Sequence, residues 1–132
     1  MPRPDRQELA AIAAGGAAGA LLRVALARTE TLAAGDWPWI TFTVNLAGAF
    51  MLGYFSTRLQ ERLPLSAYRR PLLGTGFCGA LTTFSAMQLE LLRMFDAHRY
   101  GLAAAYAGAS LAVGYAGVHV ATAVVRRVRT VA

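Results

Sequence analysis

Apolar residues are gathered into four long stretches, which short polar segments separate. The stretches lie at about residues 9–28, 38–58, 71–95 and 101–125. Each is close to the roughly 20 residues that a helix needs to cross the hydrocarbon core of a bilayer. Charged residues fall largely between the stretches. The pattern therefore predicts an all-α membrane protein with four transmembrane helices, in which residues 1–132 form a single domain.

The third stretch is long enough to span the bilayer, but its middle is poorly suited to a plain helix. Glycines are followed there by hydroxyl residues and a phenylalanine, in the order Gly74, Gly76, Gly79, Thr82, Thr83, Phe84 and Ser85. Glycine in a helix interior costs about 1 kcal/mol relative to alanine. An interrupted helix is tolerated at membrane depth only where the freed backbone groups face protein, water or an ion. We therefore expect the third helix to be interrupted, with Gly79–Ser85 as the working part of the protein.

Polar and small residues inside the first two stretches allow more than one interpretation. Gly15 and Gly19 form a pattern of small residues that lets helix backbones approach closely. Arg23 either extends to the lipid headgroups or lines an aqueous vestibule that attracts anions. Asn45 shares a helix face with Thr41 and Gly48. Its amide either joins two helices or lines a pore as a hydrogen-bond donor.

The fourth stretch carries Tyr106 and Ser110 on one helix face. Their hydroxyl groups are either structural hydrogen bonders or donors to an ion that moves past. Both alternatives are left open by the spacing.

The placement of the charged residues at the ends of the apolar stretches predicts the orientation of the chain and argues against nucleic acid as a partner. The formal net charge is +6, and all 13 basic residues are arginines that cluster at the ends of the stretches. Nine of them fall on one side, against Arg28, Arg93 and Arg99 on the other. The nine are Arg3, Arg6, Arg58, Arg62, Arg69, Arg70, Arg126, Arg127 and Arg129. Positive charge favours the cytoplasmic side, so both termini are predicted to be cytoplasmic.

The residues that are missing limit the possible chemistry. The sequence has no Ser-His-Asp set, no phosphate-binding loop and no metal-ligand cluster, so we do not expect an enzyme. Glu90 is the deepest carboxylate, and none lies at mid-depth, where proton-coupled export of cations needs one. What remains inside the stretches is hydroxyls, one amide and phenylalanine rings such as that of Phe84. Neutral donors, aromatic ring edges and a positive approach suit a small anion.

Three segments carry a resemblance to a known family: GGAAGALLR at Gly15–Arg23, TFTVNLAGAFMLG at Thr41–Gly53 and GFCGALTTFSAMQLE at Gly76–Glu90. In this order they resemble the CrcB/Fluc family of fluoride channels, and with the fourth stretch the resemblance covers nearly the whole chain. It implies a channel of the bacterial plasma membrane that passively exports cytoplasmic fluoride and so reduces its toxicity. It also implies an antiparallel, dual-topology dimer with two pores and a central structural sodium ion (Na⁺).

The resemblance further implies roles for individual residues. Those that would line the fluoride pore are Asn45, Phe84, Ser85, Met87, Tyr106 and Ser110. Gly79 and Thr82 would offer backbone carbonyls to Na⁺, and Arg23 would stand in the anion-attracting vestibule.

Two departures from the family pattern leave alternatives open. Met87 stands where the family has a second pore phenylalanine, and its thioether lacks an aromatic edge. The uneven arginine count is unusual for an antiparallel homodimer. The chain therefore pairs either with a second copy of itself or with an oppositely oriented paralogue. A further alternative is a non-conducting subunit of such a heterodimer. A small multidrug or guanidinium exporter is a further alternative, but Glu8 lies only at the edge of the first stretch.

Overall fold

The computed structural model describes residues 5–33, 35–61 and 68–130 of the chain, without the side chains of residues 59–61 and 129–130. Every regular element in these ranges is a helix, which confirms the all-α prediction. In chain order the elements are α1 (Arg6–Ala27), α2 (Trp39–Glu61), η1 (Pro71–Cys78), α3 (Gly79–Leu81), α4 (Phe84–Asp96) and α5 (Tyr100–Thr130).

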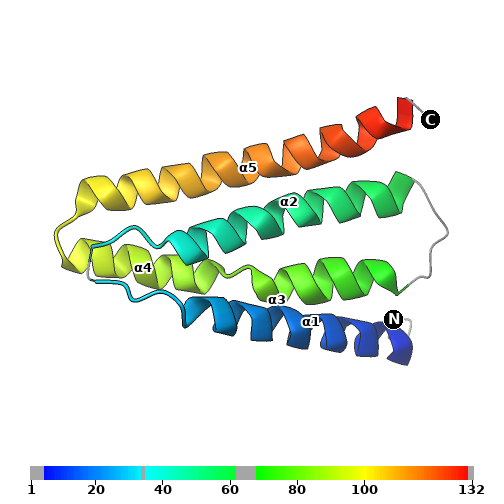
Figure 1. The fold of residues 1–132 in the computed structure, drawn as a ribbon, viewed down its shortest axis with the longest axis horizontal. Helices are drawn as coiled ribbons and strands as arrows, with labels where there is room; N and C mark the ends of the chain where they lie inside the picture. Colours follow the sequence, from blue (N-terminus) through cyan, green and yellow to red (C-terminus); the bar gives the residue numbers. More distant parts are fainter. Residues whose placement is uncertain (1–4, 34, 62–67, 131–132) are drawn as a thin grey trace.

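The helices form four roughly antiparallel rods (Figure 1). The third rod consists of η1, α3 and α4, which lie end to end, and we call it the third rod below. The start of α1 and the end of α5 lie at the same end of the bundle. Among the described residues, three helical segments are long and apolar enough to cross a membrane: Arg6–Ala27, Trp39–Arg58 and Tyr100–Val128. The third rod runs beside them but is divided, so none of its pieces reaches that length alone.

The third rod is interrupted where the sequence predicted an interruption. Thr82 and Thr83 are extended, with φ/ψ of −76°/148° and −146°/111°. The Thr83 side chain caps α4, because its Oγ1 accepts a hydrogen bond of 3.2 Å from the Ala86 N–H. The rod also begins as a π-helix over Pro71–Cys78, which the sequence analysis did not predict. Such wide turns are rare and often lie at functional sites.

Glycines bring α1 and the third rod into backbone contact. A Cβ atom added to Gly15 would lie 2.1 Å from the Leu72 carbonyl oxygen, and one added to Gly19 would lie 2.3 Å from that of Phe77. A Cβ on Gly76 would lie 2.6 Å from the Ile12 carbonyl oxygen. Such distances leave no room for a side chain, so the small residues set how closely the two rods pack.

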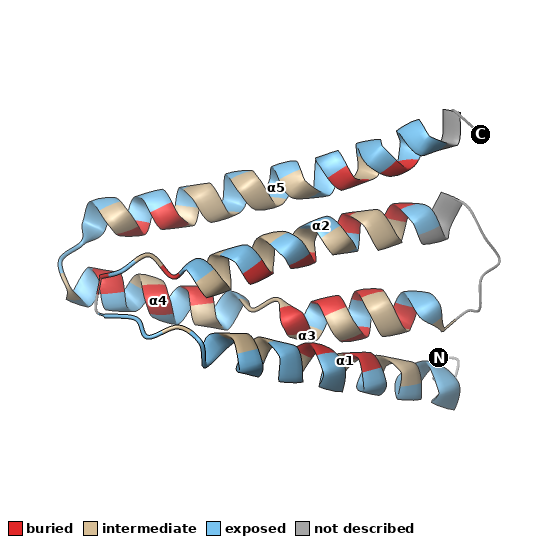
Figure 2. Ribbon diagram, in the orientation of Figure 1, coloured by how far each residue is buried: buried red, intermediate tan, exposed pale blue. Residues whose placement is uncertain are grey.

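The largest buried side chains gather toward one end of the bundle. Met87 and Met94 of α4 pack there with Ala103 and Tyr106 of α5. We call these four residues the buried cluster. Figure 2 shows exposed residues, in pale blue, along much of the outer faces of the rods. The buried cluster joins α4 to α5, while a pocket described below lies further along α2, α5 and the third rod.

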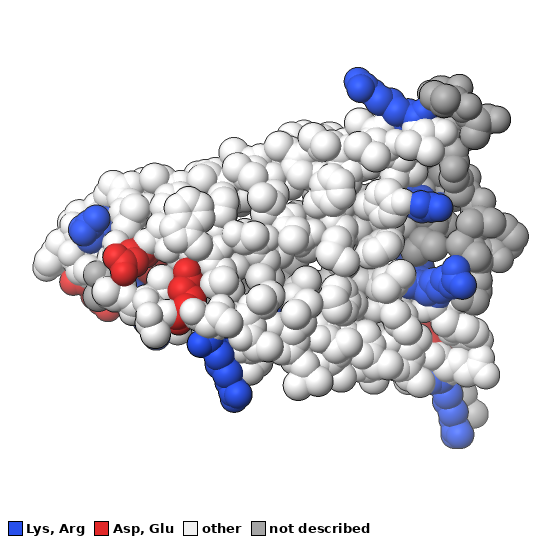
Figure 3. Space-filling view, viewed as in Figure 1, with Lys and Arg blue, Asp and Glu red and all other residues white. Residues whose placement is uncertain are grey.

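Charged side chains lie toward the two ends of the molecule, and an uncharged band separates them on the face that Figure 3 shows. Of the nine arginines predicted for one side, Arg3 and Arg62 lie outside the described residues, and so does the side chain of Arg129. The others lie near the start of α1, the end of α2, the start of the third rod and the end of α5. These positions share one end of the bundle (Figure 1).

Candidate functional site

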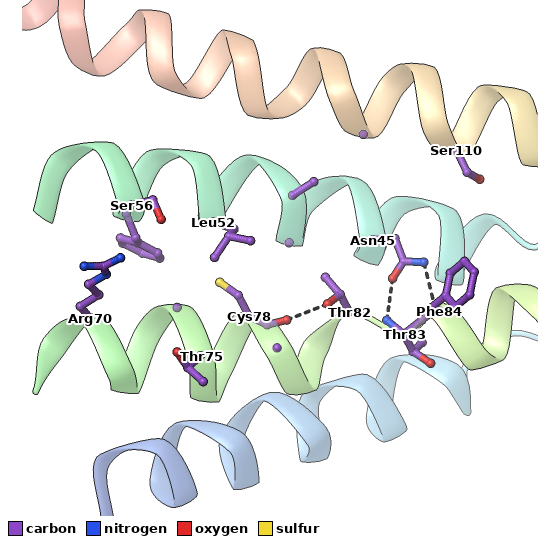
Figure 4. Close-up of a pocket in the computed structure, with 16 residues that line it drawn as sticks. Asn45, Leu52, Ser56, Arg70, Thr75, Cys78, Thr82, Thr83, Phe84 and Ser110 are labelled. Atoms are coloured by element: carbon purple, nitrogen blue, oxygen red, sulfur yellow. Dashed lines mark hydrogen bonds between the residues drawn. The ribbon is translucent and has the colours of Figure 1, made fainter. Parts of the chain in front are cut away.

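A pocket of about 700 Å³ lies between α2, α5 and the third rod (Figure 4). Arg70 and Ser56 lie at one end of it, and Asn45, Phe84 and Ser110 lie at the other. Between them the lining includes Gly48, Thr75, Cys78, Gly79, Thr82 and Thr83. Of the described residues that line the pocket, Arg70 alone carries a charge, and none is a carboxylate. The pocket is therefore lined by neutral groups, with one positive charge at its end.

Asn45 is held by two hydrogen bonds to the interruption in the third rod. The Thr83 N–H donates to Asn45 Oδ1 at 2.8 Å, and Asn45 Nδ2 donates to the Thr83 carbonyl at 3.2 Å. The amide thus joins two helices, and the same residue lines the pocket. An amide nitrogen has two N–H groups. One is used on Thr83, and the second remains as a donor at a fixed position.

The face that Asn45 shares with Thr41 and Gly48 packs against the third rod. Thr41 hydrogen-bonds to Glu90, and a Cβ on Gly48 would lie 2.1 Å from Thr82 Cγ2. Gly48 therefore leaves space for the threonine side chain beside the interruption.

The interruption changes which donors its carbonyls can use. In a continuous helix the Gly79 carbonyl accepts from the N–H of residue 83, and the Thr82 carbonyl accepts from the N–H of residue 86. Here the Thr83 N–H is directed to Asn45 and the Ala86 N–H to the Thr83 hydroxyl. Both carbonyls have lost their usual intrahelical donors, and both residues line the pocket.

Arg23 contacts the same interruption from the opposite side. Its Nε donates a hydrogen bond of 3.1 Å to the Ala80 carbonyl, within the last turn before the break. A cation is favourable at the carbonyl end of a helix. The side chain is half-buried and lies outside the pocket lining. Arg23 thus holds the end of α3 in this structure.

Phe84 and Ser110 lie at the pocket end that is remote from Arg70 (Figure 4). The Phe84 ring is 67% exposed at the start of α4. The Ser110 hydroxyl is buried and has no hydrogen-bond partner among the described residues. A buried hydroxyl without a partner is costly, so this oxygen is available to a ligand. Ser85 follows Phe84 on α4, is exposed and does not line the pocket, and its Oγ lies 3.1 Å from Thr83 Oγ1.

Tyr106 and Met87 lie in the buried cluster rather than in the pocket lining. The Tyr106 hydroxyl donates to Glu90 Oε2 at 2.6 Å, and the Thr41 hydroxyl donates to Glu90 Oε1 at 2.5 Å. From the sequence Glu90 is predicted only as the deepest carboxylate, without these partners. The three residues come from α2, α4 and α5, so no spacing within a single helix could have shown the network.

Arg70 is a further residue that the sequence analysis did not single out. In the sequence Arg70 is one of several arginines in the polar segment between the second and third apolar stretches. No signal in the sequence distinguishes it from its neighbour Arg69, which does not line the pocket.

Comparison with known proteins gives a consistent result. The family model described as "CrcB-like protein, Camphor Resistance (CrcB)" matches residues 10–122. The chain is 62% identical over 132 residues to a protein of Mycolicibacterium paratuberculosis named fluoride-specific ion channel FluC 1, with 98% of each chain covered. It is 60% identical over 129 residues to a protein of the same name from Mycobacterium tuberculosis, again with 98% of each covered. A protein of Rhizobium leguminosarum named fluoride-specific ion channel FluC is 37% identical over 116 residues, which cover 87% of this chain and 93% of that protein.

Proposed function

The chain belongs to the CrcB family, and from that membership we propose that it is a fluoride-selective ion channel that passively exports cytoplasmic fluoride. It is a multi-pass protein of the plasma membrane and not an enzyme. One observation carries the proposal beyond the names of its relatives. The pocket is lined by apolar side chains, glycines, neutral polar groups and one arginine, without a carboxylate among its described residues. This lining suits a small anion and offers no carboxylate to a permeating cation.

The proposed pore residues act by replacing part of the water that surrounds fluoride. The second N–H of Asn45 and the unpartnered Ser110 hydroxyl are donors at fixed positions in the pocket. Phe84 offers the positive edge of its ring beside them. Ser85 adds a hydroxyl that is shared with Thr83. Donors held by the fold need no reorganisation when the ion arrives, which supports selection of a small, strongly hydrated anion.

For Tyr106 and Met87 the proposal is an indirect role within one chain. Tyr106 is fully buried, and its hydroxyl is used by Glu90. Met87 packs in the buried cluster. We propose that both hold α4 against α5 and thereby position Phe84 and Ser110.

The interruption also suits a structural Na⁺ ion. Hard cations prefer oxygen ligands, and the Gly79 and Thr82 carbonyls are oxygens whose intrahelical donors are directed elsewhere. Two carbonyls are few for a cation, so a second, oppositely oriented copy would supply the others. Bound there, Na⁺ would hold the two interruptions together, and no step of fluoride conduction depends on its chemistry.

The partner in this dimer is either a second copy or a paralogue. The homodimer is the form tested below. The unequal arginine count and Met87 in place of a second pore phenylalanine support the alternative, one subunit of a heterodimer that does not conduct alone. A multidrug or guanidinium exporter has no support, because Glu8 is exposed in the first turn of α1.

The test is fluoride efflux from liposomes that hold only this purified chain, with chloride as the control anion. We expect fluoride-selective efflux. Asn45→Asp places a negative charge in the pocket and should reduce efflux by at least about tenfold. Phe84→Ala should reduce it about threefold to tenfold.

Phe95→Ala is a matched control, because Phe95 is also exposed on α4 but does not line the pocket. Its efflux should equal that of the wild type. A folded dimer without efflux would contradict conduction by this chain alone, and addition of an oppositely oriented paralogue would then test the heterodimer.

A further inference from the structure

The end of the pocket remote from Phe84 is built differently from the rest. Arg70 immediately precedes η1, and its side chain lies beside the pocket opposite Ser56 of α2 (Figure 4). Thr75 lies further along the third rod and lines the pocket as well. One exposed cation and two hydroxyl residues therefore surround this end, which we call the arginine mouth.

Two other charged side chains near this end, those of Arg58 and Asp5, have contacts of their own. The Arg58 guanidinium hydrogen-bonds to the Tyr54 hydroxyl and lies 5.6 Å from the centre of that ring. The Asp5 carboxylate accepts hydrogen bonds from the Tyr68 hydroxyl and from the Gln7 N–H, each at 3.0 Å. Neither residue lines the pocket. Arg70 is thus the charge that faces the pocket directly.

A single charge at the mouth of a pocket with largely apolar walls attracts counter-ions from beyond contact distance. Low-dielectric walls focus its field, which raises the local concentration of counter-ions and their rate of arrival. The effect extends about 30 Å at 0.01 M salt but only about 3 Å at 1 M salt. Arg23 is less suited to this role, because its Nε is used on the Ala80 carbonyl and it lies outside the pocket lining.

We propose that Arg70 captures anions at the arginine mouth and delivers them to the neutral donors of the pocket. The inference rests on the proposed fluoride channel and assigns to this residue the anion-attracting role that the sequence suggested for Arg23. Ser56 and Thr75 are the labelled hydroxyl residues of the pocket lining that lie nearest to Arg70 (Figure 4).

The test compares fluoride efflux of the full chain with that of Arg70→Gln, Arg70→Lys and Arg69→Gln at low and high concentrations of an impermeant salt. Arg69 is the control, because it is an adjacent, exposed arginine that does not line the pocket. Arg70→Gln should lower efflux about threefold to tenfold at low salt, and the loss should shrink at high salt. Arg70→Lys keeps the charge and should retain most of the efflux. Arg69→Gln should match the wild type.

Three results would contradict the proposals, two of them the role of Arg70 alone. A wild-type chain that conducts fluoride while Arg70→Gln and Arg69→Gln behave alike would overturn the role of Arg70 alone. A loss in Arg70→Gln that does not depend on salt would also overturn it, because capture by charge must be screened. A wild-type chain without fluoride efflux would overturn conduction by this chain alone and this inference with it.

Discussion

At the scale of single residues, several polar side chains within the bundle form hydrogen-bonded pairs and networks that cross between rods. Glu90 is 9% exposed and accepts hydrogen bonds from Thr41 and Tyr106. Asn45 makes a matched pair of hydrogen bonds with the Thr83 backbone. Away from water, an unmade hydrogen bond costs more than a made one contributes. These residues therefore specify how α2, α4 and α5 face one another.

Removal of the Glu90 carboxylate should destabilise the protein. Glu90→Ala leaves the buried Tyr106 hydroxyl and the half-buried Thr41 hydroxyl without their acceptor, which should cost about 2–4 kcal/mol. Glu90→Gln keeps one oxygen acceptor and should cost less. Thermal unfolding of the purified protein in detergent measures both. Gln88→Ala is the control, since Gln88 is exposed on the same helix, and a loss of the same size there would contradict the role of the network.

At the scale of elements, the third rod depends on its neighbours for its shape. Asn45 of α2 holds the interruption on one side, and Arg23 of α1 holds the Ala80 carbonyl on the other. The glycine contacts between α1 and η1 bring Arg23 within reach. An interruption that is held from two sides can present its carbonyls and Phe84 at fixed positions.

Widening of the contact between α1 and the third rod should therefore loosen the site. Gly76→Ala places a Cβ 2.6 Å from the Ile12 carbonyl oxygen and 3.0 Å from the Gly16 nitrogen, so the backbones must separate. We expect a loss of about 1–3 kcal/mol in unfolding free energy, together with reduced fluoride efflux.

Gly108→Ala is the matched control for this change. It adds a Cβ in the interior of α5 with nothing within 4 Å, and alanine is the better helix former. It should be neutral or slightly stabilising, and equal losses in the two variants would argue against the backbone contact as the cause.

At the scale of the whole molecule, one chain supplies only part of the proposed site. Gly79 and Thr82 provide two carbonyls, and the Phe84 ring is 67% exposed. A second, oppositely oriented copy would complete the carbonyl set and cover exposed parts of the pocket. The proposed Na⁺ ion would then bind only the assembled dimer, so its binding would stabilise the dimer by mass action.

Replacement of Na⁺ by an organic cation of equal ionic strength should lower the thermal stability of the dimer. At a Na⁺ concentration about 100-fold above its Kd, the expected stabilisation is about 2.7 kcal/mol. Thermal unfolding in sodium and in N-methylglucamine buffers measures the difference. The difference should shrink in Asn45→Ala, whose interruption is no longer held, and equal stability of the wild type in both buffers would contradict the site.

The sequence by itself determined the features that depend on neighbouring residues. The length of each apolar stretch predicted the helices, and the glycines followed by threonines predicted an interruption within Gly79–Ser85, because hydrophobic length and backbone freedom are local properties. The structure places that interruption at Thr82 and Thr83. Contacts between distant segments were decided only by the tertiary structure. The spacing within a helix shows which residues share a face, but not the direction in which that face turns. The rotation of each rod about its axis placed Tyr106 on Glu90, Arg23 on Ala80, and Arg70 rather than Arg69 at the pocket.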